Sequence, residues 1–192
     1  WKPGQLLKLC VLQHAVPNAH TFIQQMSSEN TRGIQVGDRI AFRGMSVVPE
    51  NIDLVVATTK DHQLCVYNLC NNMQLLCKIA KARGQPGKKT CEFDHPTGVI
   101  VTRDSKYVIV ADTKNSRLQV FSLKIDQDNT LANLSFLKEI SVIEPYDIKL
   151  NRTTNDNTQK MFVAESIDNA ITEWEIKTTS TDLHLTKIRS IT

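Results

Sequence analysis

The sequence predicts an all-β protein made of three similar units, each with four antiparallel strands. Its apolar runs are short and rich in β-branched residues, and Asn, Asp, Gly and Pro separate them, which favours strands over amphipathic helices. A strand-turn-strand pattern also recurs at a nearly constant interval. Its alanines, Ala57, Ala111 and Ala164, lie 54 and 53 residues apart. Such a regular interval is typical of repeat architectures.

Each unit is expected to contain four short strands separated by turn residues. The first unit is predicted to contain Gly44–Val48, Leu54–Thr58, Leu64–Cys70 and Gln74–Ala80. The second is predicted to contain Gly98–Thr102, Tyr107–Ala111, Leu118–Leu123 and Leu134–Val142. The third is predicted to contain Tyr146–Leu150, Met161–Glu165, Ile171–Ile176 and Leu183–Ile191. The chain then divides into units at 44–82, 83–143 and 144–192, preceded by residues 1–43, which hold the last strand of an earlier unit (Gln5–Leu12) and a long loop.

The composition is that of a globular chain, because 41% of its 192 residues are hydrophobic and its net charge is only +3. No apolar run reaches the ~18 residues of a transmembrane helix. The start lacks both an initiating Met and the apolar core of a signal peptide. We therefore expect an excised segment without a membrane-spanning helix. The mild positive charge permits an acidic partner without demanding one.

The cysteines favour a cytoplasmic location. Their number, five, is odd, and they lack C-x-x-C spacing. If residues 71–72 form a two-residue turn, Cys77 lies opposite Val66 and beyond disulfide reach of Cys70. Reduced thiols favour the cytoplasm, whereas two N-glycosylation motifs in the sequence favour the opposite compartment.

Four-stranded units repeated around an axis are the blades of a β-propeller, and the middle unit resembles the NHL repeat. The family pattern has a glycine-bearing loop, then F-x-x-P-x-G-V-A-V, then Y-V-A-D-T-x-N-x-R-I-Q-V-F. The corresponding segments of this chain are Gly84–Gly87, Phe93–Val101 and Tyr107–Phe121. The flanking units depart from the pattern at the aspartate (Thr58, Glu165) and at the arginine (Gln63, Ala170).

The resemblance implies an NHL-type propeller of which this chain holds about three complete blades. Rings of this type usually close with about six blades. We therefore expect either a fragment of a larger ring or a ring completed by a second chain, as in a homodimer. Within the motif, Asp112, Thr113 and Asn115 suit a tight turn, and Phe93 is expected to pack beneath the blade. Propellers of this class host protein-binding, RNA-binding and, in relatives, hydrolase or lyase sites.

The residues offer little support for catalysis. The histidines are scattered, and no H-x-x-x-H, H-E-x-x-H or G-x-S-x-G motif occurs. His62 and His95, both expected near one rim, are the only candidate metal ligands, and a plain turn role is the favoured interpretation of both. We predict no catalytic residue, no metal and no cofactor. A metal-dependent hydrolase or lyase is the distant alternative.

Basic residues gather on one predicted rim. In an antiparallel meander the turns alternate ends, so the loops between second and third strands and the loops between blades share a rim. The candidate binding residues there, which we call the basic rim, are Arg39, Arg43, Lys60, His62, Lys81, Arg83, Lys88, Lys89, Lys114 and Arg117, with Arg32 nearby. The matching loop of the third unit, residues 165–169, is acidic. We expect a non-catalytic scaffold that binds a protein or peptide on this rim, with single-stranded RNA as the alternative ligand. The competing interpretation is a solvated charged loop.

Overall fold

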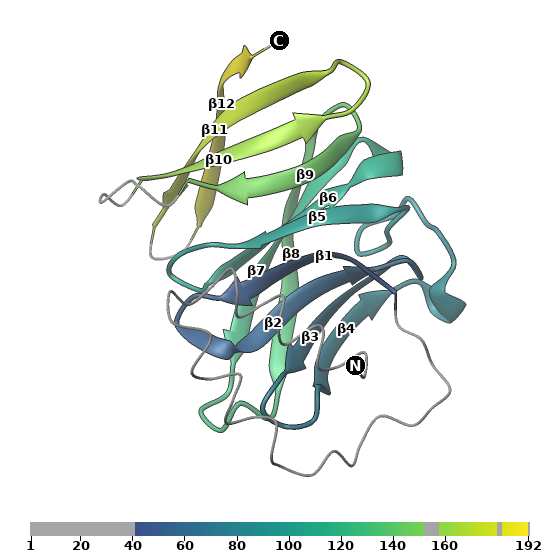
Figure 1. Cartoon of the computed structure of the whole chain (residues 1–192), viewed down its shortest axis with the longest axis vertical. Coiled ribbons are helices and arrows are strands. Elements are labelled where there is room, and N and C mark those ends of the chain that lie inside the picture. Colours follow the sequence, from purple (N-terminus) through teal and green to yellow (C-terminus); the bar gives the residue numbers. More distant parts are fainter. Residues whose placement is uncertain (1–40, 152–157, 180–181, 192) are drawn as a thin grey trace, which may run out of the picture.

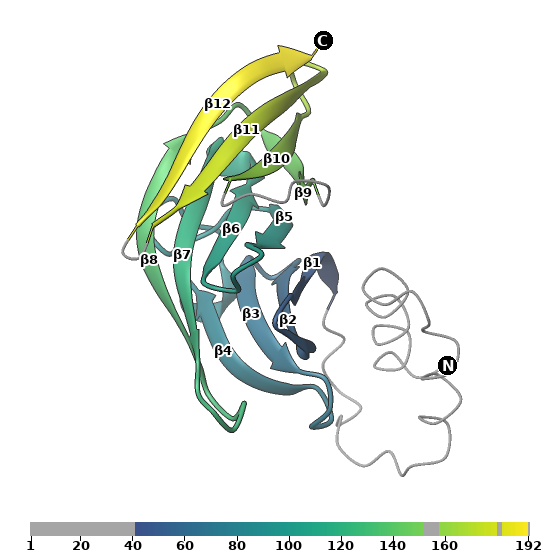
Figure 2. The ribbon, with the colours of Figure 1, turned by 90° about the vertical axis from the view of Figure 1, so that its left-hand side faces the viewer.

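The computed structural model describes residues 41–151, 158–179 and 182–191. In this part of the chain, consecutive strands form three antiparallel sheets of four strands each. The sheets follow one another along the long axis of the molecule (Figure 1), and the view turned by 90° shows them arranged as an arc (Figure 2). The prediction of an all-β chain with three four-stranded units is confirmed.

The first sheet contains β1 (Phe42–Val48), β2 (Asn51–Thr59), β3 (Gln63–Asn68) and β4 (Gln74–Ala80). The second contains β5 (Pro96–Val101), β6 (Tyr107–Asp112), β7 (Arg117–Ile125) and β8 (Ala132–Ser141). The third contains β9 (Pro145–Leu150), β10 (Thr158–Glu165), β11 (Ala170–Thr178) and β12 (Leu183–Ile191). Two short 3-10 helices, η1 (Ala82–Gly84) and η2 (Thr113–Asn115), lie in connections. The strand expected at Gln5–Leu12, together with Arg32 and Arg39, lies outside the described residues.

The repeated alanines occupy equivalent places in the three sheets. Each lies in the second strand and faces the third strand, where the partners of Ala57, Ala111 and Ala164 are Cys65, Leu118 and Ile171. Each first strand also has a register irregularity at the same point, opposite or just beyond the alanine. The three units are therefore structural repeats, as the spacing predicted.

Side chains from facing sheets form two main cores. The core between the first and second sheets includes Val56, Val66, Phe93, Val110 and Phe121. The core between the second and third sheets includes Ile109, Val120, Ile148, Met161 and Trp174. Alternate residues of β6 and β7 thus enter different cores, because successive side chains of a strand point to opposite faces of its sheet. Phe93 is fully buried, as expected, so it is part of the packing rather than of the surface.

Glycines allow the first strands of neighbouring sheets to approach closely. A Cβ atom on Gly44 would collide with the carbonyl oxygen of Thr97, and one on Gly98 would lie 2.7 Å from the backbone nitrogen of Ile148. The hydroxyl of Thr58 accepts the Gly44 amide at 2.9 Å and donates to the Thr97 carbonyl at 2.7 Å. Thr58, which replaces the aspartate of the repeat pattern, therefore links the first sheet to the second.

No disulfide joins the described cysteines to one another. Val66 pairs with Cys77 across β3 and β4, as predicted, and Cys65, Cys70, Cys77 and Cys91 form no disulfide. Burial raises the pKa of the Cys65 thiol to about 11. Among the described residues no helix has the length and apolar character to span a bilayer.

Candidate functional site

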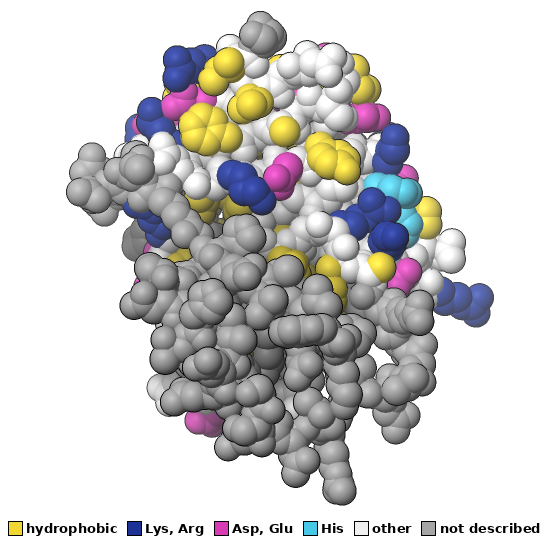
Figure 3. All heavy atoms as spheres, in the orientation of Figure 1, with side chains coloured by type: hydrophobic (Ala, Val, Ile, Leu, Met, Phe, Trp, Pro, Cys, Tyr) yellow, Lys and Arg dark blue, Asp and Glu magenta, His cyan; other side chains and the backbone are white. Residues whose placement is uncertain are grey.

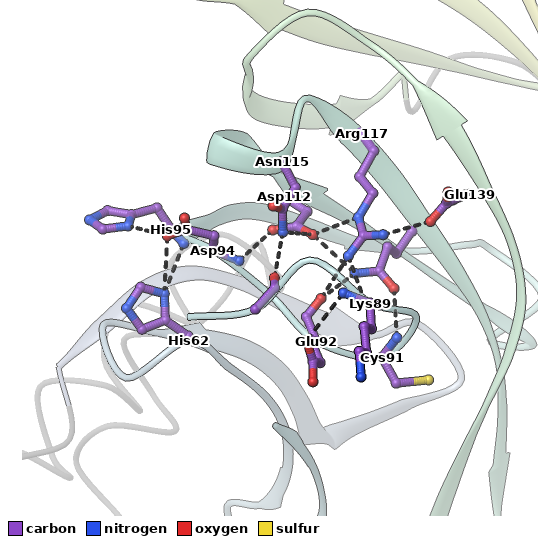
Figure 4. Close-up of polar contacts among 12 residues, drawn as sticks. His62, Lys89, Cys91, Glu92, Asp94, His95, Asp112, Asn115, Arg117 and Glu139 are labelled. Carbon is purple, nitrogen blue, oxygen red and sulfur yellow. Dashed lines mark hydrogen bonds and ion pairs between the residues drawn. The ribbon is translucent and has the colours of Figure 1, made fainter. Parts of the chain in front are cut away.

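Three loops of the basic rim lie in contact with one another. They are the β2–β3 turn, the segment between η1 and β5, and the turn around η2. The backbone amide of His95 donates to Nδ1 of His62 over 2.9 Å, which joins the first two loops. The amide of Lys114 donates to the carbonyl of Asp94 at 3.1 Å, and the side-chain amide of Asn115 donates to the carbonyl of Gly87 at 2.8 Å. Figure 4 shows His62, Asp94, His95 and Asn115 converging from these neighbouring segments.

The exposed cations of this surface are Arg43, Lys60, Lys81, Arg83, Lys88, Lys89 and Lys114. Lys114 lies 3.7 Å from Glu144 and Lys81 donates to the carbonyl of Pro86 at 3.2 Å. The side chains of Arg43, Lys60, Arg83 and Lys88 form no ion pair with another described residue. Figure 3 shows Lys and Arg side chains beside histidines at one edge of the molecule. Arg39, the remaining arginine predicted here, lies outside the described residues.

Arg117 differs from the expectation of a solvent-facing rim residue, because it is only 7% exposed. Its Nε donates to Asp112 at 2.8 Å and its Nη1 donates to Glu139 at 2.6 Å. Its Nη2 donates to the carbonyls of Lys89 and Glu92, both at 2.9 Å. The guanidinium is therefore paired within the protein and is not available to a ligand. It instead stabilises the loop that carries Lys88 and Lys89.

Asp112 is the centre of the same network and is fully buried. Its carboxylate accepts the amide of Asp94 at 2.8 Å, the side chain of Asn115 at 2.9 Å, Nε of Arg117 and, at 3.1 Å, the side chain of Gln119. Burial raises the pKa of Asp112, and the hydrogen bonds from Asn115, Asp94 and Arg117 act in the opposite direction. Asp112 and Asn115 therefore have a structural role, as the sequence indicated. Their hydrogen bonds extend beyond the local turn to the segment before β5 and to β7.

The 87–92 loop is held on the network at several points. Besides the two carbonyls bound by Arg117, Gln119 donates to the carbonyl of Glu92 at 2.8 Å and accepts the amide of Cys91 at 3.2 Å. Glu92 in turn accepts the amide of Lys89 at 3.1 Å. Gln119 and Glu92 were not singled out in the sequence, although Gln119 occupies the glutamine position of the repeat pattern. The loop consequently presents its two lysines from a fixed backbone.

Two histidines and an aspartate form a compact cluster in the middle of the rim. Asp94 Oδ1 lies 2.9 Å from Nδ1 of His95 and 3.6 Å from Nδ1 of His62. The imidazole rings meet edge to face with their centroids 5.0 Å apart. Burial lowers the pKa of His62, with a further lowering by His95, while the Asp94 carboxylate acts in the opposite direction.

The rim also exposes apolar side chains that the sequence reasoning missed. Ile143, Tyr146 and Ile167 are 50%, 57% and 60% exposed. The loops that carry them are joined, because the amide of Ser166 donates to the carbonyl of Glu144 at 3.2 Å. Lys114 also approaches Glu144, so this apolar group, which we call the apolar edge, borders the basic part of the rim. Exposure of single apolar residues in short connections has no distinctive sequence pattern.

The third-sheet loop at 165–169 is less acidic at its surface than the sequence indicated. Glu165 is 5% exposed. Its carboxylate accepts the hydroxyl of Thr172 at 2.7 Å and lies 3.6 Å from Nζ of Lys187. Asp168 is the exposed carboxylate of this loop.

Residues 93–121 match the family model of the NHL repeat. The chain thus contains one NHL-type repeat, at the place where the sequence resembled the family. No curated protein matches the sequence at a significant level.

Solved structures of β-propellers are similar to this chain. One is a putative 6-phosphogluconolactonase from Bacteroides uniformis, with a TM-score of 0.58 and 13% identity over 84% of this chain and 43% of that one. Another is Sqt1 from Chaetomium thermophilum bound to the N-terminus of the ribosomal protein L10, with a TM-score of 0.55 and 14% identity over 81% of this chain and 38% of that one. A third is the periplasmic gluconolactonase PpgL from Pseudomonas aeruginosa, with a TM-score of 0.53 and 15% identity over 78% of this chain and 39% of that one.

These likenesses establish the fold alone, because their identities are 13–15%. The three sheets are blades of a β-propeller, and they do not close into a ring by themselves. The chain spans less than half the length of each of the three proteins. The similar proteins include both lactonases and a peptide-bound protein, so function has to be argued from the rim itself.

Proposed function

We propose that this chain is a non-catalytic interaction module that binds an acidic protein segment on the rim formed by the basic residues and the apolar edge. The observation that carries this proposal is the fixed 87–92 loop, which presents Lys88 and Lys89 to solvent from a backbone anchored by Arg117 and Gln119. A preorganised loop loses less conformational entropy when a ligand binds.

The charges of the rim suit an acidic ligand. Arg43, Lys60 and Arg83 are exposed and form no ion pair within the described residues, so an incoming carboxylate would displace no partner from that part of the chain. Cations on one surface steer an acidic partner toward it and raise the rate of association.

The apolar edge can supply the apolar contacts that the charged residues of the rim do not provide. Aromatic side chains contribute strongly to protein interfaces, because they bury a large area at a small cost in side-chain entropy. Tyr146, 57% exposed, is the exposed aromatic ring of this edge. An acidic segment with an apolar residue next to its carboxylates therefore matches both parts of the rim. The likeness to Sqt1, whose structure holds a ribosomal protein segment, supports a peptide as ligand.

The geometry supports a structural role for the buried acid. Asp112 has a raised pKa, a feature that also marks catalytic carboxyls. Four donors occupy its carboxylate, and Arg117 lies within ion-pair distance. Because this carboxylate is fully buried and engaged by these donors, it is not exposed to solvent for proton transfer. We accordingly infer that the rim binds without catalysing a reaction. We also propose a cytoplasmic location, because the described cysteines form no disulfide with one another.

The proposal is tested by measuring the affinity of the chain for a panel of acidic peptides with one aromatic or aliphatic residue. The double variant Lys88→Glu/Lys89→Glu should bind at least about tenfold more weakly. The matched control is Lys106→Glu/Lys124→Glu, which reverses two exposed lysines at the ends of strands on the opposite rim. Equal weakening by both variants would show a net-charge effect and would contradict the proposal.

Single-stranded RNA is the alternative ligand for the same charges. Among the described rim residues Phe93 is buried and Tyr146 is exposed, so the surface offers little aromatic area for base stacking. An RNA oligonucleotide belongs in the same assay. Binding that is stronger than to any peptide and that falls steeply with salt would favour RNA.

We also propose that further blades cover the outer face of the third sheet. Ile171 and Ile191 pair across β11 and β12 and are 48% and 45% exposed on this face. Unpaired apolar sheet faces favour association. A second copy of the chain or the rest of a longer protein would supply those blades. A mass measurement in solution distinguishes a dimer of 21.7 kDa chains from a monomer.

A further inference from the structure

The histidine cluster of the rim has the composition and spacing of a metal site. His62 comes from the β2–β3 turn, and Asp94 and His95 come from the segment before β5. One ligand atom from each residue lies within 4.8 Å of the other two. In Figure 4 the side chain of His62 and the side chain of Asp94 point toward each other, with His95 alongside. Two segments that are distant in the sequence thus bring three donor groups to one point.

We propose that His62, Asp94 and His95 bind one divalent transition metal ion of the Zn²⁺ class. Zinc takes imidazole nitrogens and carboxylate oxygens at about 2.0–2.2 Å, which places tetrahedral ligand atoms roughly 3.3 Å apart. The distances from Asp94 Oδ1 to the two Nδ1 atoms, 2.9 and 3.6 Å, lie on either side of that spacing. Calcium and magnesium prefer all-oxygen sites, so the two imidazoles favour a transition metal.

The donor groups are held in place before any ion binds. Both histidines adopt left-handed backbone conformations, with φ of 56° at His62 and 53° at His95. The amide of Asp94 donates to the buried Asp112 at 2.8 Å, and its carbonyl accepts the amide of Lys114. Nδ1 of His62 accepts the amide of His95, so this nitrogen carries a lone pair that faces the cluster. An ion would replace that amide as the partner of the His62 lone pair, and it would replace the proton that Nδ1 of His95 donates to Oδ1 of Asp94.

The charges around the cluster partly oppose one another. Asp94 provides the negative charge that a dication requires, and Asp61 adds to it near His62, whereas the positive charge of Arg43 acts on the same imidazole. Replacing Arg43 should therefore strengthen metal binding while it weakens binding of an acidic peptide. Because this substitution should change the two affinities in opposite directions, metal binding and peptide binding can be tested separately.

Isothermal titration of the chain with Zn²⁺, and with Co²⁺ followed by its visible absorption, tests the site. We expect one ion per chain. Asp94→Asn keeps the size and an accepting oxygen but removes the charge, and it should weaken binding at least about tenfold, as should His95→Gln. The matched control is His184→Ala, because His184 is exposed and lies 3.6 Å from Asp182, and no third His, Cys, Asp or Glu of the described residues completes a cluster there.

The outcomes are distinguishable even if one variant is unstable. Circular dichroism shows whether each variant is folded. Arg43→Gln should raise the affinity for Zn²⁺, and unfolding would not produce such a gain. Absence of Zn²⁺ and Co²⁺ binding to the unaltered chain would overturn the inference. Stoichiometric binding that is unchanged in folded Asp94→Asn and His95→Gln variants, or that is lost in His184→Ala, would also overturn it.

Discussion

Arg117 and Asp112 form an ion pair beneath the basic rim, with Nε and Oδ2 2.8 Å apart and both side chains buried. Because the same guanidinium also binds the carbonyls of Lys89 and Glu92, the pair connects the packed interior of the second blade to the loop that presents the rim lysines.

Replacing Asp112 with Asn should reduce the free energy of unfolding by about 3–5 kcal/mol, because it removes the buried counter-charge of Arg117 and leaves only the exposed Glu139. Glu139→Gln is the matched control, since Glu139 contacts the same guanidinium but its side chain is 51% exposed. That substitution should cost less than about 1 kcal/mol. Urea unfolding measures both values. A similar loss of unfolding free energy in the two variants would show that the buried Asp112 contact stabilises the protein no more than the exposed Glu139 contact does.

Replacing Gly98 with Ala should destabilise the protein by about 3 kcal/mol, because the new Cβ meets the backbone of Asp147 and Ile148 in the next blade. Gly87→Ala provides the comparison. There two of the three nearest atoms lie toward the end of the Glu92 side chain, which can rotate away, and only Cβ of Glu92, at 2.8 Å, requires a shift of the loop, so the cost should be smaller. Thermal unfolding of both variants measures the difference. An Ala at position 98 that leaves the unfolding midpoint unchanged would contradict the close approach of β5 and β9.

Glu173 should make stability depend on pH in the acidic range. Its carboxylate accepts Nζ of Lys160 at 2.8 Å and Nε of Arg189 at 2.6 Å, and these hydrogen bonds, Lys160 first, lower its pKa. A lowered folded-state pKa gives stability that is present above the unfolded-state value of about 4.3 and is lost as the pH falls through the folded-state pKa. The stability difference between the unaltered chain and Glu173→Gln should therefore shrink below about pH 4. A difference that stays constant from pH 7 to pH 3 would show that ionisation of Glu173 is irrelevant.

Tyr146→Ala should weaken peptide binding about tenfold and leave stability nearly unchanged, because the side chain is 57% exposed. Leu131→Ala is the control, since Leu131 is 67% exposed in the β7–β8 turn on the opposite rim. Fluorescence anisotropy with a labelled acidic peptide measures the affinity. If both substitutions have the same effect, the apolar edge is not part of the binding surface.

The fold was predictable because its signals are periodic. The regular interval between Ala57, Ala111 and Ala164 and the alternation of apolar residues within each strand can both be read directly from the order of residues. The direction of Arg117 was not predictable in this way, because its burial depends on Glu92 and Glu139, which join it only in the folded chain.

The site was predictable in outline and not in detail. The sequence placed His62 and His95 near one rim but gave no sign that Asp94 lies between them. It also gave no sign of the apolar edge, because the exposure of Tyr146 is decided by the packing of neighbouring blades. Conversely, Glu165 counted as a surface acid until the structure showed it buried against Thr172.

Nuclear magnetic resonance of the isotopically labelled chain during titration with an acidic peptide tests recognition by the basic rim residue by residue. We predict that the amide signals that change belong to the 87–92 loop, to the β2–β3 turn and to the residues around Tyr146. Changes confined to the β5–β6 and β7–β8 turns, which lie on the opposite rim, would contradict recognition by the basic rim.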